Sequence, residues 1–364
     1  MTKKIWIGLL LVLICFPFAC VEQISFPLNR QVGKLIVFGQ ITNLAEEKTI
    51  YLSSTTSEDR QPLPSGDYLV LNDLPRPVTN AQVFLIGSDN SFVPFIHRSE
   101  GRYELDRNVP ILNGVAYGVE IRVNGKIYRS SPEELPSAVG SDELSYEFSR
   151  GELDGTPDLA MISIYSEVTL PDTSEPYYLK WEVSEAYFWQ LTFFPNPFNQ
   201  APPLCFVFET PDPERIPLLN GESLSETALG GRQLLAKRQV DQSFLSRHYF
   251  TIRQVSLSES AFEYWRNVRE LVNNTGSVFD TPPAPIRGNI VNVEDENEQV
   301  LGYVEVARVS QKRIYTTLAD VPFELEEVCL YDPNKPVIDY PQTCRNCNAF
   351  GNSSNEIPEW WFDQ

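Results

Sequence analysis

The sequence contains very little histidine. His97 and His248 are the only two in 364 residues, and neither has the spacing of a zinc ligand pair. A histidine-based metal centre is therefore not expected. His248, at the start of a β-rich run, fits a hydrogen-bonded structural residue better than a catalytic base.

Motifs of the common enzyme classes are also missing. There is no GxSxG nucleophile elbow, no HExxH pair, no GxxxxGK(S/T) phosphate loop and no GxGxxG that opens a helix. With 49 acidic residues some carboxylates must approach one another by chance, so they do not identify a glycosidase. We predict a protein that is not an enzyme and has neither a cofactor nor a bound metal.

Positive charge is scarce. The chain has 29 Lys and Arg residues against 49 Asp and Glu, a formal net charge of -20. Nucleic acid and anionic lipid both attract basic surfaces, so neither is expected to bind this chain through its charge.

No apolar run is long enough to span a bilayer. The longest, Ile5 to Ala19, follows two lysines and ends at Cys20, which predicts an export signal over residues 1–19. Small Ala19 before Cys20 is similar to the lipobox of bacterial lipoproteins, so Cys20 is the expected lipidation site; a plain secretory signal cut near Ala19 is the alternative. Removal of the signal removes two lysines and no acids, which brings the charge to -22.

Cysteine is also infrequent, with six residues in all. Apart from Cys15 and Cys20, four remain: Cys205, Cys329, Cys344 and Cys347. An even number in an exported chain favours disulfides over a zinc site, although the last two form a CxxC motif. Three pairings are possible, and the spacing does not choose among them.

The segment that follows a tether at 20–34 carries several short β-rich runs. In one of them apolar residues alternate from Tyr117 to Val123, as in a half-buried strand, and Asn124-Gly125 predicts a type I′ hairpin turn. Short strands at this spacing predict an immunoglobulin-like β-sandwich over residues 35–138. The predicted strands lie at Leu35–Thr42, Thr49–Thr55, Ala81–Gly87, Gly101–Leu105 and 117–130.

Residues 139–364 are predicted to form a second, larger β domain that ends in the CxxC tail. Its one amphipathic helix, expected at 257–275, has a wide apolar stripe that should lie on a sheet. Ser256 and Glu259 fit a capping box, and Gly276 fits the C-terminal cap. The predicted strands lie at Leu159–Leu170, Tyr177–Val183, Cys205–Phe208, Tyr249–Val255 and Gly302–Val309.

Two stretches could belong to a binding site. The aromatic run AYFWQLTFFPNPF at 186–198 indicates either a buried strand that runs into a loop or an apolar contact surface. The acidic stretch VEDENEQ, Val293 to Gln299, lacks the pattern of a calcium loop and is interpreted as a solvated turn. The candidate contact residues are Tyr187, Trp189, Phe193, Phe194 and Phe198.

The run AFEYWRNVRELVNNTGSVFDTPPAPIRGNIVNVEDENEQVLGYVEVARVSQKRIY, residues 261–315, resembles the core of the domain-of-unknown-function 4249 (DUF4249) family of Bacteroidota lipoproteins. LIVFGQITN at the start, the strand at Cys205 and the closing CxxC fit the same pattern. Arg345-Asn346 and GNSSN stand where the family usually has an acidic residue and a Gly-rich stretch.

The resemblance implies an outer-membrane lipoprotein whose first domain is a transthyretin-like sandwich. Since such proteins are often encoded beside TonB-dependent transporters, we expect a non-enzymatic accessory or lid subunit of such a barrel, anchored in lipid through Cys20. A stand-alone ligand-capture protein for glycan, peptide or a metal complex is the alternative. The sequence does not decide which face of the outer membrane the protein occupies.

Overall fold

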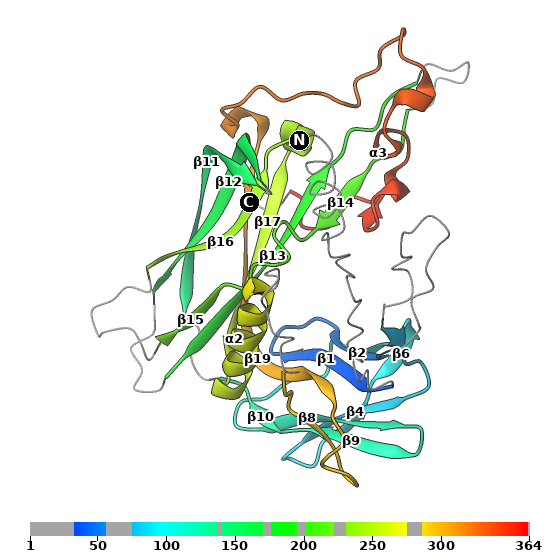
Figure 1. Cartoon of the computed structure of the whole chain (residues 1–364), viewed down its shortest axis with the longest axis vertical. Coiled ribbons are helices and arrows are strands. Elements are labelled where there is room, and N and C mark those ends of the chain that lie inside the picture. Colours follow the sequence, from blue (N-terminus) through cyan, green and yellow to red (C-terminus); the bar gives the residue numbers. More distant parts are fainter. Residues whose placement is uncertain are drawn as a thin grey trace, which may run out of the picture.

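The computed structural model describes residues 33–55, 75–136, 140–153, 155–169, 176–194, 201–221, 231–274 and 286–362. Cys20, Phe198 and Gly276 lie outside these ranges. The fold is mainly β, as predicted, and its strands form three sheets (Figure 1).

The five runs predicted for the first part all form strands, and four further short strands were not predicted. Asn124 and Gly125 both have positive φ, 50° and 78°, as the predicted type I′ turn requires. The strands are β1 (Leu35–Thr42), β2 (Lys48–Ser54), β3 (Arg76–Pro77), β4 (Gln82–Gly87), β5 (Phe92–Pro94), β6 (Ile96–Ser99), β7 (Arg102–Leu105), β8 (Ala116–Val123), β9 (Lys126–Ser130) and β10 (Glu133–Glu134).

The second part contains longer strands; the sequence analysis missed two of these, β11 and β16, and the short strands β15, β18 and β20. The strands are β11 (Ser141–Leu153), β12 (Thr156–Thr169), β13 (Tyr178–Phe188), β14 (Phe206–Glu209), β15 (Leu218–Asn220), β16 (Arg232–Gln239), β17 (His248–Leu257), β18 (Ile290–Asn292), β19 (Leu301–Thr316) and β20 (Ser353–Ser354). The helices are η3 (Gln242–Leu245), α2 (Glu259–Asn274), η4 (Leu318–Asp320), η5 (Val337–Asp339), α3 (Gln342–Arg345) and η6 (Cys347–Ala349).

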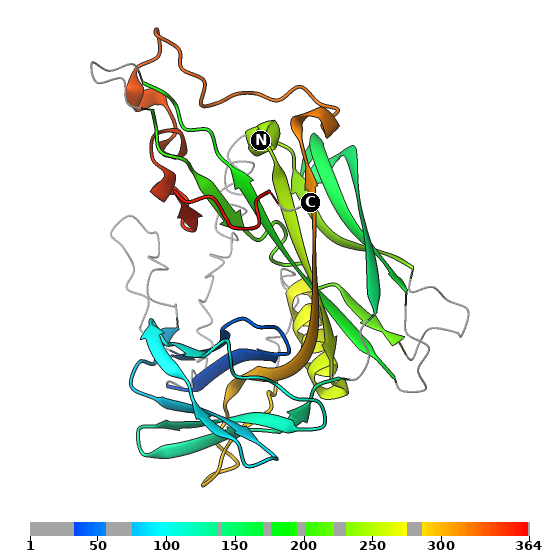
Figure 2. The same cartoon turned by 180° about the vertical axis from the view of Figure 1, so that it is seen from behind.

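One long sheet joins the two parts. Its strand order is β20-β14-β13-β17-β19-β1-β2-β7-β6, with β15 beside β13 and β3 beside β2. The first half of β19 runs parallel to β1 and its second half runs antiparallel to β17, so a single strand passes from one part to the other (Figure 2).

Two smaller sheets pack on one face of this long sheet. At one end the sheet β18-β9-β8-β4-β5, with β10 beside β8, closes a sandwich around a core that includes Val37, Ile50, Val119 and Ile121. At the other end the sheet β11-β12-β16 covers a second core that includes Trp181. The molecule is thus two sandwiches that share a sheet.

The predicted division into domains 35–138 and 139–364 does not follow this architecture. Ile290 in β18 and Val304 and Val306 in β19 belong to the core of the first sandwich. β18 and β19 pair with β9 and β1 of the first part, although more than 150 residues, which form the second part, precede them in the chain. Contacts of this kind leave no local signal in the sequence.

Helix α2 packs on the opposite face of the long sheet, as its apolar stripe predicts. Ala261, Phe262 and Tyr264 are buried against residues of β13, β17 and β19. The predicted cap is wrong by two positions: the Ser258 hydroxyl, not that of Ser256, accepts a hydrogen bond from the Ala261 amide, at 3.2 Å. Ser256 stays in β17 because strands on both sides pair with it.

Gly302 makes the parallel pairing of β1 and β19 possible. Its φ is +92°, and a Cβ atom there would lie 2.0 Å from the carbonyl oxygen of Val37 in β1. Gly288 approaches Gly302 from the other side, where a Cβ would lie 1.7 Å from the Gly302 carbonyl oxygen. Both glycines therefore give the backbone room that no other residue leaves.

We expect Gly302→Ala to lower the free energy of unfolding by about 3 kcal/mol, since it adds a backbone clash to the cost of positive φ. Gly114→Ala is the matched control, because Gly114 also has positive φ, +71°, but nothing within 4 Å of its Cβ position. The control should lose only about 1 kcal/mol. Urea unfolding of both variants measures the difference, and equal losses would contradict the role of close packing.

Candidate functional site

The predicted aromatic contact run begins inside the molecule. Tyr187 is only 2% exposed and donates a hydrogen bond to Glu209 at 2.9 Å, so its assignment as a partner-contact residue is wrong. It is buried because Cys205, Val207 and Cys347 pack against it and its ring stacks on that of His248, with centroids 5.0 Å apart. Trp189 is half-buried, and its Nε1 donates to the carbonyl of Thr343 at 3.1 Å.

The run then reaches the surface. Phe193 is exposed, whereas Phe194 is half-buried and meets the rings of Tyr331 and Tyr340 edge-on, with centroids 6.1 and 5.2 Å away. Phe198 lies outside the described residues. Of the five candidates, Phe193 therefore presents an exposed ring.

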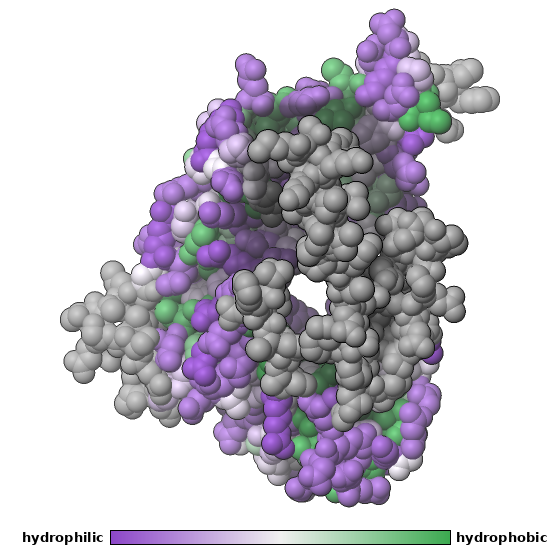
Figure 3. Space-filling model, viewed as in Figure 1, coloured by the Kyte–Doolittle hydropathy of each residue, from purple (hydrophilic) through white to green (hydrophobic). Residues whose placement is uncertain are grey.

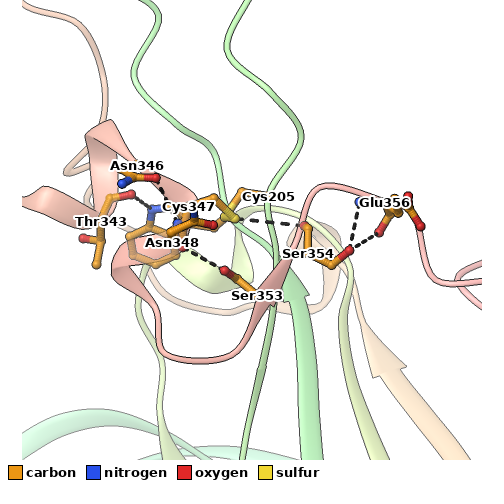
Figure 4. The surroundings of a disulfide bond; sticks show 9 residues. Cys205, Thr343, Asn346, Cys347, Asn348, Ser353, Ser354 and Glu356 are labelled. Carbon is orange, nitrogen blue, oxygen red and sulfur yellow. Dashed lines mark hydrogen bonds between the residues drawn. A yellow bond between two sulfur atoms is a disulfide. The ribbon is translucent and has the colours of Figure 1, made fainter.

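The four cysteines form two disulfides, so the prediction of disulfides is confirmed. The CxxC motif does not close on itself: Cys347 bonds to Cys205, and Cys344 bonds to Cys329. Around the first bond, the Ser353 hydroxyl donates to the carbonyl of Cys347, and the Asn346 side chain accepts from the amide of Asn348 (Figure 4). Each cysteine of the motif thus connects a different part of the chain.

The Cys205–Cys347 bond attaches the C-terminal tip, residues 317–362, to the end of the long sheet, whereas the Cys329–Cys344 bond closes a loop within the tip. Thr192, just after β13, donates to the carbonyl of Cys329 at 2.7 Å and through its amide to that of Cys344 at 2.8 Å. At the other end of the tip, Trp361 packs against Phe206 and Tyr249. The tip has little regular secondary structure, so the disulfides and these contacts fix its position.

The tip exposes large apolar side chains instead of burying them. Ile338 is 78% exposed and Leu330 is 66% exposed. Both lie on the loop that the Cys329–Cys344 disulfide closes. The space-filling view shows apolar surface at the upper right of the molecule, where the tip lies (Figure 3). The further exposed apolar residues of this loop are Tyr331 and Val337.

A second candidate site is a network of charged side chains on the helix-bearing face of the long sheet, which we call the junction cluster. It consists of Gln40, Glu46, Lys180, Glu182, Arg253, Trp265 and Glu305. Strand register builds it, because Gln40 lies directly opposite Glu305, and Glu182 lies opposite Arg253. The sequence offered only the alternation of Lys180 and Glu182 on one face of their strand.

Lys180 is the centre of the cluster. Its Nζ lies 2.9 Å from Glu305 Oε1, 3.0 Å from Glu182 Oε1 and 3.9 Å from the centre of the Trp265 ring. Trp265 in turn donates to Glu305 Oε2 at 2.7 Å. The buried ammonium group is therefore compensated by two carboxylates and an aromatic face.

Gln40 and Arg253 extend the cluster to β1 and the loop after it. The Gln40 amide donates to Glu305 at 2.6 Å and accepts from Arg253 at 2.9 Å, and Arg253 also binds Glu46 at 2.8 Å. These contacts connect the two sandwiches through side chains as well as through β19.

The ionisation states follow from these contacts. Burial alone would lower the pKa of Lys180, but the charges of Glu305 and Glu182 hold the pKa of Lys180 above its ordinary value. Burial likewise opposes ionisation of Glu182, and Lys180 with Arg253 brings the pKa of Glu182 below its ordinary value. Burial, with a contribution from Glu305, raises the pKa of Tyr264 on α2 to about 12.

Two cavities of about 350 and about 390 Å³ adjoin at the cluster and share Lys180, Glu182, Arg253 and Trp265. The first extends toward Pro213 and Pro217. The second extends over the face of β1 and β2 that points away from the sandwich core, where its walls include Phe38 and Tyr51. Together they form a groove of the size of ligand sites in proteins.

Neither His248 nor the acidic turn forms a separate site. His248 is fully buried, with its Nε2 2.9 Å from Glu185 Oε2, which agrees with a structural role. Burial opposes ionisation of Glu185, but His248 and Arg238 hold the pKa of Glu185 below its ordinary value. In the turn, Glu298 binds Lys126 and Asn292. The part of the chain that the structure describes contains no group of three His, Cys, Asp or Glu side chains that could hold a metal ion.

Fold and sites together define a β-sandwich protein with a groove at the junction and a disulfide-bonded tip. The chain belongs to the DUF4249 family, described as a domain of unknown function, whose model matches residues 21–313. The match ends just before the tip. No match was found among curated proteins.

Within the described ranges, no helix combines the length and the apolar character that crossing a bilayer requires.

Proposed function

We propose that the protein is a Bacteroidota lipoprotein, held at the outer membrane by acylated Cys20, that serves as a non-enzymatic accessory or lid subunit of a TonB-dependent transporter. The observation that carries the proposal is the exposed apolar loop of the C-terminal tip. Large exposed apolar patches on exported proteins serve as contact surfaces.

The tip suits protein contact for two further reasons. One disulfide attaches the tip to the sheet and the other closes its exposed loop, so little conformational entropy is lost when its apolar side chains bind a partner. The net charge of -20 disfavours anionic lipid as the surface that the tip touches. An apolar groove on a protein partner is then the surface that best fits Leu330 and Ile338.

The first experiment isolates the tagged, lipidated protein from its native outer membrane in mild detergent and identifies co-eluting proteins by mass spectrometry. We expect a TonB-dependent barrel in stoichiometric amount. Leu330→Ser with Ile338→Ser should reduce its recovery at least tenfold without change in the melting temperature, since both side chains are exposed.

The matched control is Val291→Ser with Val293→Ser, two exposed apolar residues on and just after β18, at the end of the molecule opposite the tip (Figure 1). It should leave recovery of the barrel unchanged. Elution of the wild-type protein without a barrel would refute the accessory-subunit proposal.

Ligand capture is a second candidate function, and the groove at the junction cluster favours it. This function does not need a barrel, since the groove and the tip lie on different parts of the molecule. Trp265, Phe38 and Tyr51 line the groove, whereas Tyr187, one of the predicted contact residues, is buried.

A further inference from the structure

The open end of the groove presents two aromatic rings on one flat surface. Phe38 in β1 lies directly opposite Tyr51 in β2, and they are 41% and 52% exposed. The residues on the other face of the same strands, such as Val37 and Ile50, are fully buried in the sandwich core. The core therefore does not need these two rings, and polar residues would serve the solvated face of a strand equally well.

Helix α2 covers only part of this face. It packs on Tyr303 and Ala307 of β19, the strand next to β1, and its Trp265 forms the wall of the groove between α2 and Gln40. Phe38 and Tyr51 lie beyond the helix and continue the aromatic surface of Trp265. A ligand that lies along the groove would meet three aromatic side chains in succession.

The polar groups beside the rings are mainly carboxylates, which accept hydrogen bonds, together with the side-chain amide of Gln40. The second cavity is lined by Gln40, Glu46, Glu47 and Thr49 as well as by the rings. Carboxylates accept hydrogen bonds from hydroxyl groups, and an amide both donates and accepts. Such a wall suits a ligand rich in hydroxyl groups.

The charge of the groove excludes an anionic ligand. Lys180 already binds Glu182 and Glu305, Arg253 binds Glu46, and Arg107 binds Glu47. Arg215, on the wall of the first cavity, donates instead to the carbonyl of Leu234. Carboxylates outnumber cations among the residues that line the two cavities. A phosphate or a uronic acid would meet like charge.

Strand order makes an extended peptide a poor occupant. β1 and β2 are inner strands of the long sheet, with β19 and β7 on their outer sides, so neither offers an open edge for strand addition. A metal complex held by protein ligands is also disfavoured, since the described residues form no three-ligand group.

We infer that the groove binds a neutral oligosaccharide, whose sugar rings stack on Phe38 and Tyr51 while their hydroxyl groups bond to the carboxylates and amides beside them. The weakly polar C–H face of a sugar ring fits an aromatic face. Successive sugar units match the successive rings along the groove. The inference concerns a site separate from the tip, so it does not depend on the transporter contact.

The test is isothermal titration of the full-length protein in mild detergent with a panel of neutral hexasaccharides built from glucose, mannose, galactose or xylose. At least one should bind, and Phe38→Ala with Tyr51→Ala should weaken its binding at least tenfold, which corresponds to about 1.4 kcal/mol. Binding should change little between 50 and about 500 mM salt, since the ligand carries no charge.

Phe92→Ala is the matched control, because Phe92 is 50% exposed but lies in β5, on the other sheet of the same sandwich. It should leave affinity unchanged. Failure of the entire panel to bind, or equal affinity of the Phe38/Tyr51 variant, would overturn the inference, and binding of a random peptide panel in its place would make the groove a peptide site. Recovery of the barrel should be unchanged in this variant, so the two proposals can fail separately.

Discussion

Lys180→Met should lower the free energy of unfolding by about 3–5 kcal/mol, because it removes one partner of a buried charge network. Lys180 and Glu305 have side chains only 4% and 5% exposed. After the substitution Glu305 is held in the interior without its cation. Chemical denaturation at pH 7 measures the loss.

Lys126→Met is the control for an ion pair at the surface. Lys126 lies 2.8 Å from Glu298, but its side chain is 48% exposed, so we expect a loss below about 1 kcal/mol. A similarly small loss for Lys180→Met would show that the junction cluster does not stabilise the fold.

The dependence on pH gives an independent test. The pKa of Lys180 is raised in the folded protein, so its contribution is complete below its unfolded pKa of about 10.4 and is lost as pH rises through the folded value. The pKa of Glu182 is lowered, so its contribution is lost as pH falls below about 4.5. The variant Lys180→Met should therefore lose less stability than the wild type at alkaline pH. Acidification neutralises the carboxyl groups, so the difference in free energy of unfolding between the wild type and the variant should become smaller at low pH.

Cys205→Ala with Cys347→Ala should have the second large effect, a loss of about 5 kcal/mol by the chain-entropy estimate for a long loop. The bond joins residues 142 positions apart, whereas Cys329–Cys344 spans only 15, for which the same estimate gives about 3 kcal/mol. Alanine avoids a buried hydroxyl at Cys205, which is fully buried.

The place of the damage should also differ between the two bonds. Without Cys205–Cys347, the tip keeps only its packing and hydrogen bonds to the sheet, so limited proteolysis should cut within residues 317–362 while the two sandwiches stay intact. Without Cys329–Cys344, cleavage should be confined to the loop between them. Mass spectrometry of the fragments distinguishes the outcomes, and a resistant tip in the first variant would contradict its role as the anchor.

The sequence predicts the presence of the disulfides but not which cysteines they join. The disulfides could be expected from four cysteines in a chain with an export signal, but their pairing could not. Cys344 and Cys347 are three positions apart, and a helical turn followed by η6 sends them toward different partners, Cys329 and Cys205. Only the path of the chain between them decides the connectivity.

The contact residues show the same limit. The run from Tyr187 to Phe194 is rich in aromatic residues, yet Tyr187 in β13 is buried against Cys205, Val207 and Cys347, while Phe193 lies beyond the end of the strand and is exposed. Both side chains are aromatic, so residue type does not distinguish the buried one from the exposed one. Exposure depends on which distant segments cover a side chain, and the sequence does not display this locally.

Local sequence patterns predicted the mainly β class, the longer strands within residues 35–130, the Asn124-Gly125 hairpin and the apolar stripe of α2, because alternation, turn chemistry and helical period act over a few residues. The tertiary structure alone decided that β19 belongs to both sandwiches and that Gln40, Lys180, Arg253 and Glu305 meet on one face. Those contacts join residues more than fifty positions apart, and pairing between distant strands depends on the whole fold.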